Sequence, residues 1–394
     1  MPEYDESVRK SYKGGFTYLT PEYKEVDIGE GLVLDVNSLY PSVMRNCPLP
    51  YDEPIFYVGE YQPDPLYNMY VQEIVCQFEL REGFIPTIQI KDGYNYRFMP
   101  TEYLTSSEGE FVTLWLTSVD LELFKKHYHV LNPSYTCGFK FKSTTGLFTE
   151  YIDKWTKVKI EATRNGNKAM RTLAKLMLNA LYGKFALSPR VASKFPYYED
   201  GVIKYRVPRD PETKKVIYEM REPIYIPVGS FITAWARYKT ITSAQKVKDI
   251  FVYADTDSLH LKLKLPPELS RMSNKELEQL TTKDLQRYGV PLPDDFEVDP
   301  VALGAWKIES RFTRARFIRQ KCYIEDWNPP ETWDTEDYDP KLLNITCAGM
   351  PSRCYPYVTW ENFHEGASYG GKLLPSHVKG GIVLKEIEFT IKKA

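Results

Sequence analysis

The 394-residue sequence has few cysteines and histidines and no long hydrophobic run. Its six cysteines are scattered without a CxxC pair, and its five histidines do not cluster with them, which argues against a zinc site and a disulfide framework. No apolar stretch approaches the roughly 20 residues of a membrane helix, and the N-terminal "MPEYDESVRK" is too polar for a signal peptide. These absences predict a protein that spans no membrane and resides in a reducing cytoplasm.

The sequence also lacks an excess of charge of either sign. The formal net charge is −2, so any nucleic-acid partner has to be bound by locally concentrated positive charge. The length and the apolar fraction of 43% predict two or three folded units and exclude a disordered chain. The 30 tyrosines suit either a β-rich core and surface or stacking against bases and sugars, and composition leaves both open.

Hydrophobic periodicity predicts the main elements along the chain. Residues 69–80 are a strand, 147–183 are helical, and 229–247 form a helix that leads into a hairpin at 250–265. An alternating apolar pattern around "DPETKKVIYEM", within the Pro- and Tyr-rich block 186–227, predicts a protruding hairpin.

Three aspartates follow predicted strands that are rich in apolar residues. "GLVLD" ends at Asp35, and "YADTDS" places Asp255 and Asp257 where a second strand turns. An isolated DxD is more often a plain turn, but acids that meet at one sheet edge repel each other unless cations intervene. Mg²⁺ prefers oxygen ligands, and a pair of such ions can promote phosphoryl transfer. The pattern therefore favours a divalent-metal site.

A polar stripe on the helix "RTLAKLMLNALYGKF" strengthens this interpretation. Helical spacing puts two cations, an amide and an aromatic ring on one face: Arg171, Lys175, Asn179 and Tyr182. Such a face suits a triphosphate beside a flat ring, whereas a solvated charged surface explains the lysines but not the rest. The stretch 306–326 mixes basic and aromatic residues, which suits a phosphate backbone with stacked bases or a charge-protected edge strand.

The ordered motifs resemble those of one enzyme family. "DVNSLYPS", "KLMLNALYG" and "YADTDS" are similar to motifs A, B and C of family B DNA polymerases, "YKGGF" to their YxGG motif and "KCY" to their KxY motif. Blocks 51–146 and 186–227 resemble the two insertions of protein-primed phage members, which are strand-displacing replicative polymerases. Three features depart from the pattern: Ala180 stands where Ser is usual, 160–167 is slightly expanded, and no N-terminal exonuclease region precedes YxGG.

The resemblance implies an α+β fold of the right-hand polymerase type, with a palm built on an antiparallel sheet, fingers, a small thumb and two insertion subdomains. The expected boundaries are palm 1–50 and 228–345, first insertion 51–146, fingers 147–185, second insertion 186–227 and thumb 346–394. The expected activity is templated extension of a primer 3′-hydroxyl, or of a terminal-protein hydroxyl, with dNTPs. Processive strand displacement is expected, without 3′–5′ exonuclease in this chain.

The resemblance also implies roles for individual residues. The catalytic and metal-binding group is Asp35, Asp255 and Asp257, with the Val36 carbonyl as a further metal ligand. The nucleotide-binding residues are Tyr40, Lys159, Arg171, Lys175 and Tyr182. The DNA-binding residues are Tyr12, Gly14, Gly15, Asn179, Gly183, Lys321 and Tyr323.

Two Mg²⁺ ions are the expected cofactors, with Mn²⁺ as a substitute. Primer-template DNA and dNTPs are the expected partners of a monomer in the cytoplasm of a phage-infected bacterium. A terminal protein and a separate exonuclease chain are open as further partners. Two other functions fit part of the pattern: a non-catalytic replisome protein, which has no need of repelling acids, and a metal-dependent nuclease, which leaves the Lys175 stripe unexplained.

Overall fold

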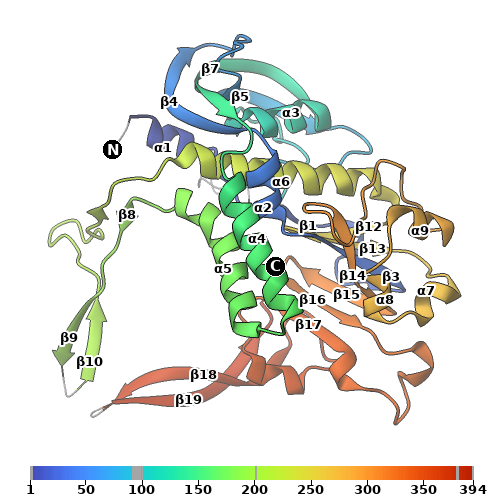
Figure 1. Cartoon of the computed structure of the whole chain (residues 1–394). Helices are drawn as coiled ribbons and strands as arrows, with labels where there is room; N and C mark the ends of the chain where they lie inside the picture. The colour runs from blue at the N-terminus through green and yellow to red at the C-terminus, as the bar shows by residue number, and fades with distance from the viewer. Residues whose placement is uncertain (1–2, 91–98, 100, 200–201, 379–380, 393–394) are drawn as a thin grey trace.

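The computed structural model describes residues 3–90, 99, 101–199, 202–378 and 381–392. It contains helices and predominantly antiparallel sheets in separate regions, which confirms the predicted α+β class (Figure 1). Among these residues, no helix is long and apolar enough to cross a membrane.

The central sheet has five antiparallel strands in the order β1-β12-β13-β3-β14. Their bounds are β1 Thr17–Leu19, β12 Phe251–Asp255, β13 Ser258–Lys262, β3 Gly31–Val36 and β14 Trp306–Phe312. The apolar runs "GLVL" and "FVYA" are buried in β3 and β12, and in each strand the aspartate at or next to the end is only half-buried. The predicted hairpin at 250–265 is confirmed as β12 and β13.

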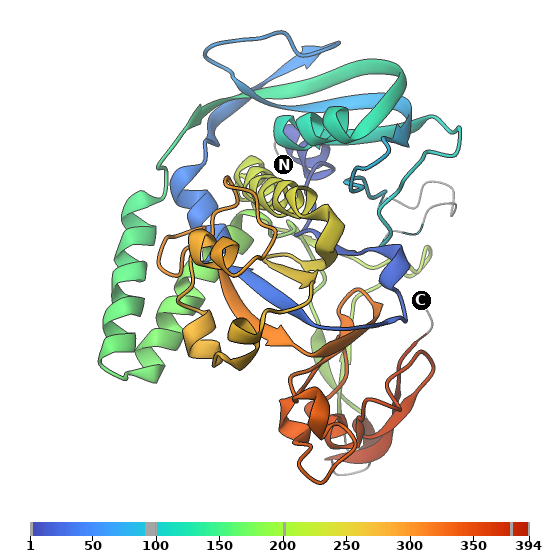
Figure 2. The ribbon, with the colours of Figure 1, turned by 90° about the vertical axis from the view of Figure 1, so that its right-hand side faces the viewer.

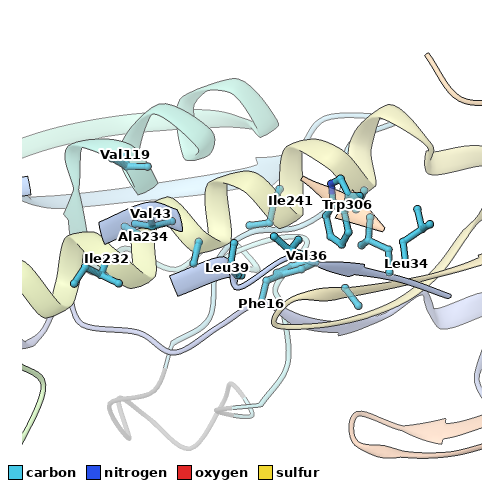
Figure 3. Close-up of a cluster of buried hydrophobic side chains, with 14 of the residues drawn as sticks. Phe16, Leu34, Val36, Leu39, Val43, Val119, Ile232, Ala234, Ile241 and Trp306 are labelled. Atoms are coloured by element: carbon cyan, nitrogen blue, oxygen red, sulfur yellow. The ribbon is translucent and has the colours of Figure 1, made fainter. Parts of the chain in front are cut away.

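A long helix, α6 Ile226–Lys246, lies between this sheet and the first inserted sheet (Figures 1 and 2). Figure 3 shows Ile241 of α6 in one apolar cluster with Leu34 and Val36 of β3 and Trp306 of β14. Two shorter helices, α1 Glu3–Arg9 and α2 Leu39–Asn46, pack against α6 as well. The helix predicted at 229–247 is therefore confirmed, and it supports the sheet edge where the aspartates lie.

The strands between residues 49 and 144 form a separate sheet in the order β4-β7-β5-β6, with helix α3 on one face. The bounds are β4 Leu49–Val58, β5 Met69–Leu80, β6 Val112–Thr117, α3 Ser118–His127 and β7 Tyr128–Thr144. This sheet has its own buried cluster around Phe78, Phe124 and Tyr128. The strand predicted at 69–80 matches β5.

Two antiparallel helices project from the body over the segment predicted to be helical. They are α4 Thr149–Arg164 and α5 Lys168–Phe185, interrupted at 165–167 (Figure 1). Few of their residues are buried, so most of the cationic stripe on α5 is open to solvent.

The described residues of the block 186–227 form an extended ribbon that contains the predicted hairpin. The outer hairpin is β9 Phe195–Glu199 with β10 Val202–Arg206, whereas the stretch around 210–220 makes a turn and then strand β11. The base of the ribbon is β8 Arg190–Val191 paired with β11 Glu219–Met220.

A second sheet, in the order β17-β16-β15-β2, joins the central sheet to the C-terminal region. Its strands are β2 Asp27–Ile28, β15 Arg314–Arg319, β16 Cys322–Asp326 and β17 Leu343–Cys347. The chain ends in the hairpin β18 Ser368–Val378 and β19 Gly381–Thr390. Its inner end shares one buried cluster with β16 and β17, so the expected thumb boundary at 345/346 falls inside β17.

Short helices complete the structure and lie mostly on its surface. They are α7 Pro267–Arg271, α8 Asn274–Leu277, α9 Thr282–Arg287, and the 3-10 turns η1 Pro21–Tyr23, η2 Lys248–Ile250, η3 Pro330–Thr332, η4 Pro340–Leu342 and η5 Ser352–Tyr357.

Candidate active site

Asp35 and Asp257 lie side by side at one edge of the central sheet. Ser258 of β13 pairs in register with Asp35 of β3 on one side and with Asp255 of β12 on the other. The backbone N–H of Val36 donates to the carbonyl oxygen of Asp257, with an N···O distance of 2.7 Å. The sheet therefore brings together the three acids that the sequence singled out.

The turn that carries Asp257 is held from two sides. Thr256 has a left-handed φ of 62°, its N–H donates to the carbonyl of Phe16 and its carbonyl accepts from the Thr240 hydroxyl, both at 2.7 Å. A Cβ atom on Gly15 would lie 2.6 Å from the Thr256 side chain. Gly15 is therefore needed for packing against this turn.

The two acids disfavour each other's charge. Burial, with the charges of Asp257 and Glu309, raises the pKa of Asp35 to about 7. Burial also raises the pKa of Asp257, to which the charges of Asp255 and Glu309 contribute. Near neutral pH this edge either retains a proton or takes up a cation.

A divalent cation fits this donor set. Among the described residues, no three His, Cys, Asp or Glu side chains are arranged to hold a metal by themselves. Mg²⁺ in phosphate-transferring sites is usually held by one or two carboxylates, with water and substrate phosphates as the other ligands. The half-buried pair of Asp35 and Asp257 matches that arrangement.

Cations from three elements, α4, α5 and β14, lie near the acids. Lys159 of α4 has its Nζ 3.4 Å from the Ser38 hydroxyl, just beyond β3. Burial, and then the charges of Arg171, Lys175 and Lys307, lowers the pKa of Lys159. Several positive groups therefore share a small region beside the carboxylates. An anion bound between them relieves this repulsion, and a polyphosphate carrying a divalent cation fits both groups.

Two predicted aromatic residues stack beside these charges. The rings of Tyr40 and Tyr182 lie 4.0 Å apart between centroids and are inclined by 21°. Burial raises the pKa of Tyr12, with the charge of Tyr182 contributing, so Tyr12 belongs to the same group. On α5, Asn179 is exposed, and a Cβ on Gly183 would meet no atom within 4 Å.

Comparison with known proteins identifies the family. The family model described as DNA polymerase type B, organellar and viral, matches residues 2–274. This chain belongs to that family. The DNA polymerase of Bacillus phage phi29 is 45% identical over 98% of this chain, and that of Streptococcus phage Cp-1 is 31% identical over 92%.

A solved structure of a relative has the same fold as this type B chain. Phi29 DNA polymerase in complex with primer-template DNA and incoming nucleotide superposes on the whole chain with a TM-score of 0.82 and 44% sequence identity. The expected right-hand polymerase fold is therefore confirmed. The chain spans 62% of the length of the phi29 protein and 56% of that of the Cp-1 protein.

The KxY residues of this type B chain differ in their exposure. The Lys321 Nζ lies 2.8 and 3.1 Å from the two carboxylate oxygens of Asp255, and its backbone N–H donates to the Tyr253 hydroxyl. Tyr323, by contrast, is buried in a cluster with Tyr253 and Phe317. Lys321 is accessible to a ligand, whereas Tyr323 packs behind it.

Part of the basic and aromatic stretch 306–326 is occupied inside the protein. Arg314 pairs with the buried Asp326, and its guanidinium lies 4.0 Å from the Trp333 ring and 4.1 Å from the Trp360 ring. Arg316 pairs with Asp27. These two arginines stabilise the second sheet, whereas the exposed Lys321 pairs with Asp255 and the half-buried Lys307 lies beside Asp35.

Sequence reasoning missed two residues near the site. Glu309 lies on β14, whose Lys307 pairs in register with Asp35, and it raises the pKa of both acids. The alternation in "WKIES" puts Lys307 and Glu309 on one face and is a usable signal. Arg237 of α6 donates to the carbonyls of Lys13 and Gly14, and no local pattern predicts that contact.

Proposed function

We propose that this family B chain is a template-directed DNA polymerase that extends a primer 3′-hydroxyl with dNTPs by a two-metal mechanism. The observation that carries the proposal is the pair Asp35 and Asp257 at one sheet edge, opposite the cations of α4 and α5. The phi29 protein, which belongs to the same family and is 45% identical to this chain, is a DNA polymerase.

In this mechanism Asp35 and Asp257 would hold two Mg²⁺ ions, or Mn²⁺ in their place, with the Val36 carbonyl as a further ligand. The ions supply charge stabilisation for the attacking and the leaving oxygen. Because the pKa of Asp35 is raised to about 7, a bound cation would compete with a proton at this acid near neutral pH. Asp255, bound to Lys321, is the least engaged with metal of the three.

The cations of α4 and α5 bind the triphosphate. Lys175, Arg171 and Lys159 contact its oxygens and neutralise the pyrophosphate as it leaves. The Tyr40 ring, fixed by its stacking on Tyr182, lies under the sugar and leaves no room for a 2′-hydroxyl. Tyr182 supports the new base pair.

The template and primer strands are held by residues of several segments. Asn179 and Gly183 line the template side, together with Tyr12, Gly14 and Gly15 of YxGG. Lys321 binds the primer strand, and Tyr323 supports it from behind. The first insertion, 51–146, grips the duplex product and any terminal protein primer.

The second insertion separates the strands of downstream duplex. The β9–β10 and β18–β19 hairpins reach toward the same side of the molecule (Figure 1), which suits an enclosure around DNA. Enclosure limits dissociation without net positive charge. Replacing 194–207 with a short Gly-Ser linker preserves the β8–β11 base. We expect the variant to extend an open template normally but to lose extension from a nick when a DNA trap is present.

The decisive experiment for the function is primer extension by this chain with Mg²⁺ on a single-stranded template. Stepwise extension that follows the template sequence supports the proposal, and no incorporation by folded protein contradicts it. A primer with a mismatched 3′ end tests the expectation that these residues do not excise it. Removal of the mismatch contradicts that expectation without affecting the polymerase assignment.

The Lys321–Asp255 pair gives a prediction about the primer side. We expect Lys321→Ala and Asp255→Asn each to weaken primer-template binding, and the double variant to be little worse than either, because the residues act together. Binding is measured by fluorescence anisotropy without metal. Lys264→Ala, which alters another exposed lysine, is the control. Additive losses contradict the coupling.

A further inference from the structure

Two cysteines face each other across β16 and β17, directly beside the KxY lysine. Cys322 and Cys347 are register partners, and their sulfur atoms are 3.3 Å apart. The Ala348 N–H donates to the Lys321 carbonyl at 2.7 Å, so the backbone hydrogen bond lies between the flanking residues and the cysteines form a non-hydrogen-bonded pair. Such pairs bring Cα atoms to about 4.5 Å and are the closest in an antiparallel sheet.

This arrangement satisfies the geometric requirements of a disulfide. A disulfide needs Cα atoms about 4.4–6.8 Å apart and sulfurs at about 2.05 Å, so the sulfurs have little more than one ångström to close. The two strands are already paired over five residues, and both cysteines lie in the cluster that joins β16 and β17 to the C-terminal hairpin. Closure therefore requires no rearrangement of the backbone pairing.

We propose that Cys322 and Cys347 are a reversible modification site at which a small organic disulfide or comparable thiol oxidant forms an intramolecular cross-link. The cross-link fastens the strand that begins immediately after Lys321 to the strand that leads into the C-terminal region. This inference is independent of the proposed polymerase activity.

The chemistry follows from the contact between the two sulfurs. The hydrogen bond from Cys322 lowers the pKa of Cys347, so the Cys347 thiolate attacks one sulfur of the reagent and releases the first thiolate. Cys322 then attacks the Cys347 sulfur, forms the protein disulfide and releases the second thiolate, while its proton passes to solvent. Two thiols are oxidised and one reagent disulfide is reduced, which balances atoms and electrons.

The site is selective because, among the described residues, no other cysteine faces a cysteine across a strand pair: Cys76 faces Val112, and Cys137 faces Val58 and Glu73. Cys47 and Cys137 are partly exposed and react only to mixed disulfides, which add the mass of the reagent. Cys354 lies in the same buried cluster as the pair and is the natural internal control. Since Cys347 is 5% exposed and Cys322 is fully covered, the reaction is slow with bulky reagents and faster with small ones.

The test treats the native protein with 2-hydroxyethyl disulfide, then unfolds it in an alkylating agent and maps peptides by mass spectrometry. We expect a peptide that links Cys322 to Cys347 with the loss of two hydrogens, and alkylated Cys76 and Cys354. The thermal unfolding midpoint is expected to rise by several degrees and to return after dithiothreitol. The gain follows because the bond constrains the unfolded chain.

Variants distinguish this site from other outcomes. Cys354→Ser is expected to form the same link, whereas Cys322→Ala and Cys347→Ala are each expected to lose both the link and the thermal shift. Full alkylation of Cys322 and Cys347 after prolonged treatment of the folded wild-type protein overturns the proposal. A link from either residue to Cys354 overturns it equally.

Discussion

Replacement of Asp35 with asparagine is expected to lower the rate of nucleotide incorporation by about three orders of magnitude or more. The substitution preserves shape but removes one of the two negative charges that face each other at the sheet edge. Metal-ion stabilisation of the reacting oxygens is worth several kcal/mol, and about 4 kcal/mol corresponds to roughly a thousandfold in rate. Single-turnover extension at saturating DNA, dNTP and Mg²⁺ measures the effect.

The pH dependence of stability tests whether the Asp35→Asn variant folds like the wild-type protein. The pKa of Asp35 is raised from 3.8 to about 7, chiefly by burial, so its stabilising contribution to the metal-free protein is complete below about pH 4. That contribution is lost as the pH rises to about 7. The amide of the Asp35→Asn variant does not titrate, so the variant's unfolding midpoint relative to wild type is expected to increase over this range. Mg²⁺ competes with the proton and reduces the difference.

Two results separate a catalytic role from a structural one. Asp35→Asn is expected to bind primer-template DNA with wild-type affinity in the absence of metal. Asp153→Asn, at an exposed acid on α4, is expected to incorporate nucleotides at the wild-type rate. Incorporation by folded Asp35→Asn within tenfold of wild type contradicts the assignment of Asp35 as a metal ligand.

The convergence of the acids could be predicted because it depends on local pattern. "GLVLD" and "FVYAD" each combine a buried apolar run with a terminal acid, and both runs became strands of one sheet. The strand at 69–80 likewise alternates between buried and half-buried residues, whereas the helix at 229–247 is apolar on most of its faces and begins earlier than predicted, at Ile226. Periodicity reports which face of an element is buried, and here that suffices to place the acids at an edge.

Contacts between distant side chains could not be predicted in this way. Lys321 looked like a free cation for DNA, yet it bridges to Asp255. Arg314 belonged to a basic run, but its planar guanidinium lies between two tryptophans that the sequence places far from each other. The residue type shows which groups a side chain can bind. Whether such a group lies within the protein or on a ligand depends on the folded structure.

The ribbon at 186–227 shows a further limit. The hairpin predicted within this block is present as β9 and β10, whereas the residues around 210–220 form a tight turn closed by the bridge between Arg209 and Val216 and then strand β11. The strands of an exposed ribbon have no buried face, so hydrophobic alternation specifies their register only weakly.

Replacement of Asp120 with alanine is expected to cost about 3–5 kcal/mol of unfolding free energy, the usual penalty for removing one partner of a buried ion pair. Asp120 of α3 and Arg237 of α6 form a buried pair with N···O distances from 2.7 to 3.0 Å. Burial opposes ionisation of Asp120, but the charge and hydrogen bonds of Arg237 outweigh it and hold its pKa below the usual value. The alanine variant leaves the Arg237 charge buried and unpaired. Urea unfolding near pH 7 measures the loss.

The loss of unfolding free energy in Asp120→Ala arises from the unpaired Arg237 charge. A variant that removes both charges tests this explanation. Asp120→Leu combined with Arg237→Met removes both charges and is expected to recover much of the stability, because a buried ion pair and an apolar replacement of similar size often contribute similar stability.

Asp153→Ala is the control. It breaks the exposed pair with Arg45 and is expected to leave the unfolding midpoint unchanged. The difference between wild type and Asp120→Ala is expected to shrink as the pH falls below about 4 and the wild-type carboxylate is protonated. If Asp120→Ala unfolds at the wild-type urea concentration, the pair does not hold the first insertion against α6. Because Arg237 also binds the carbonyls of Lys13 and Gly14, a destabilised pair is expected to loosen the YxGG loop together with the insertion.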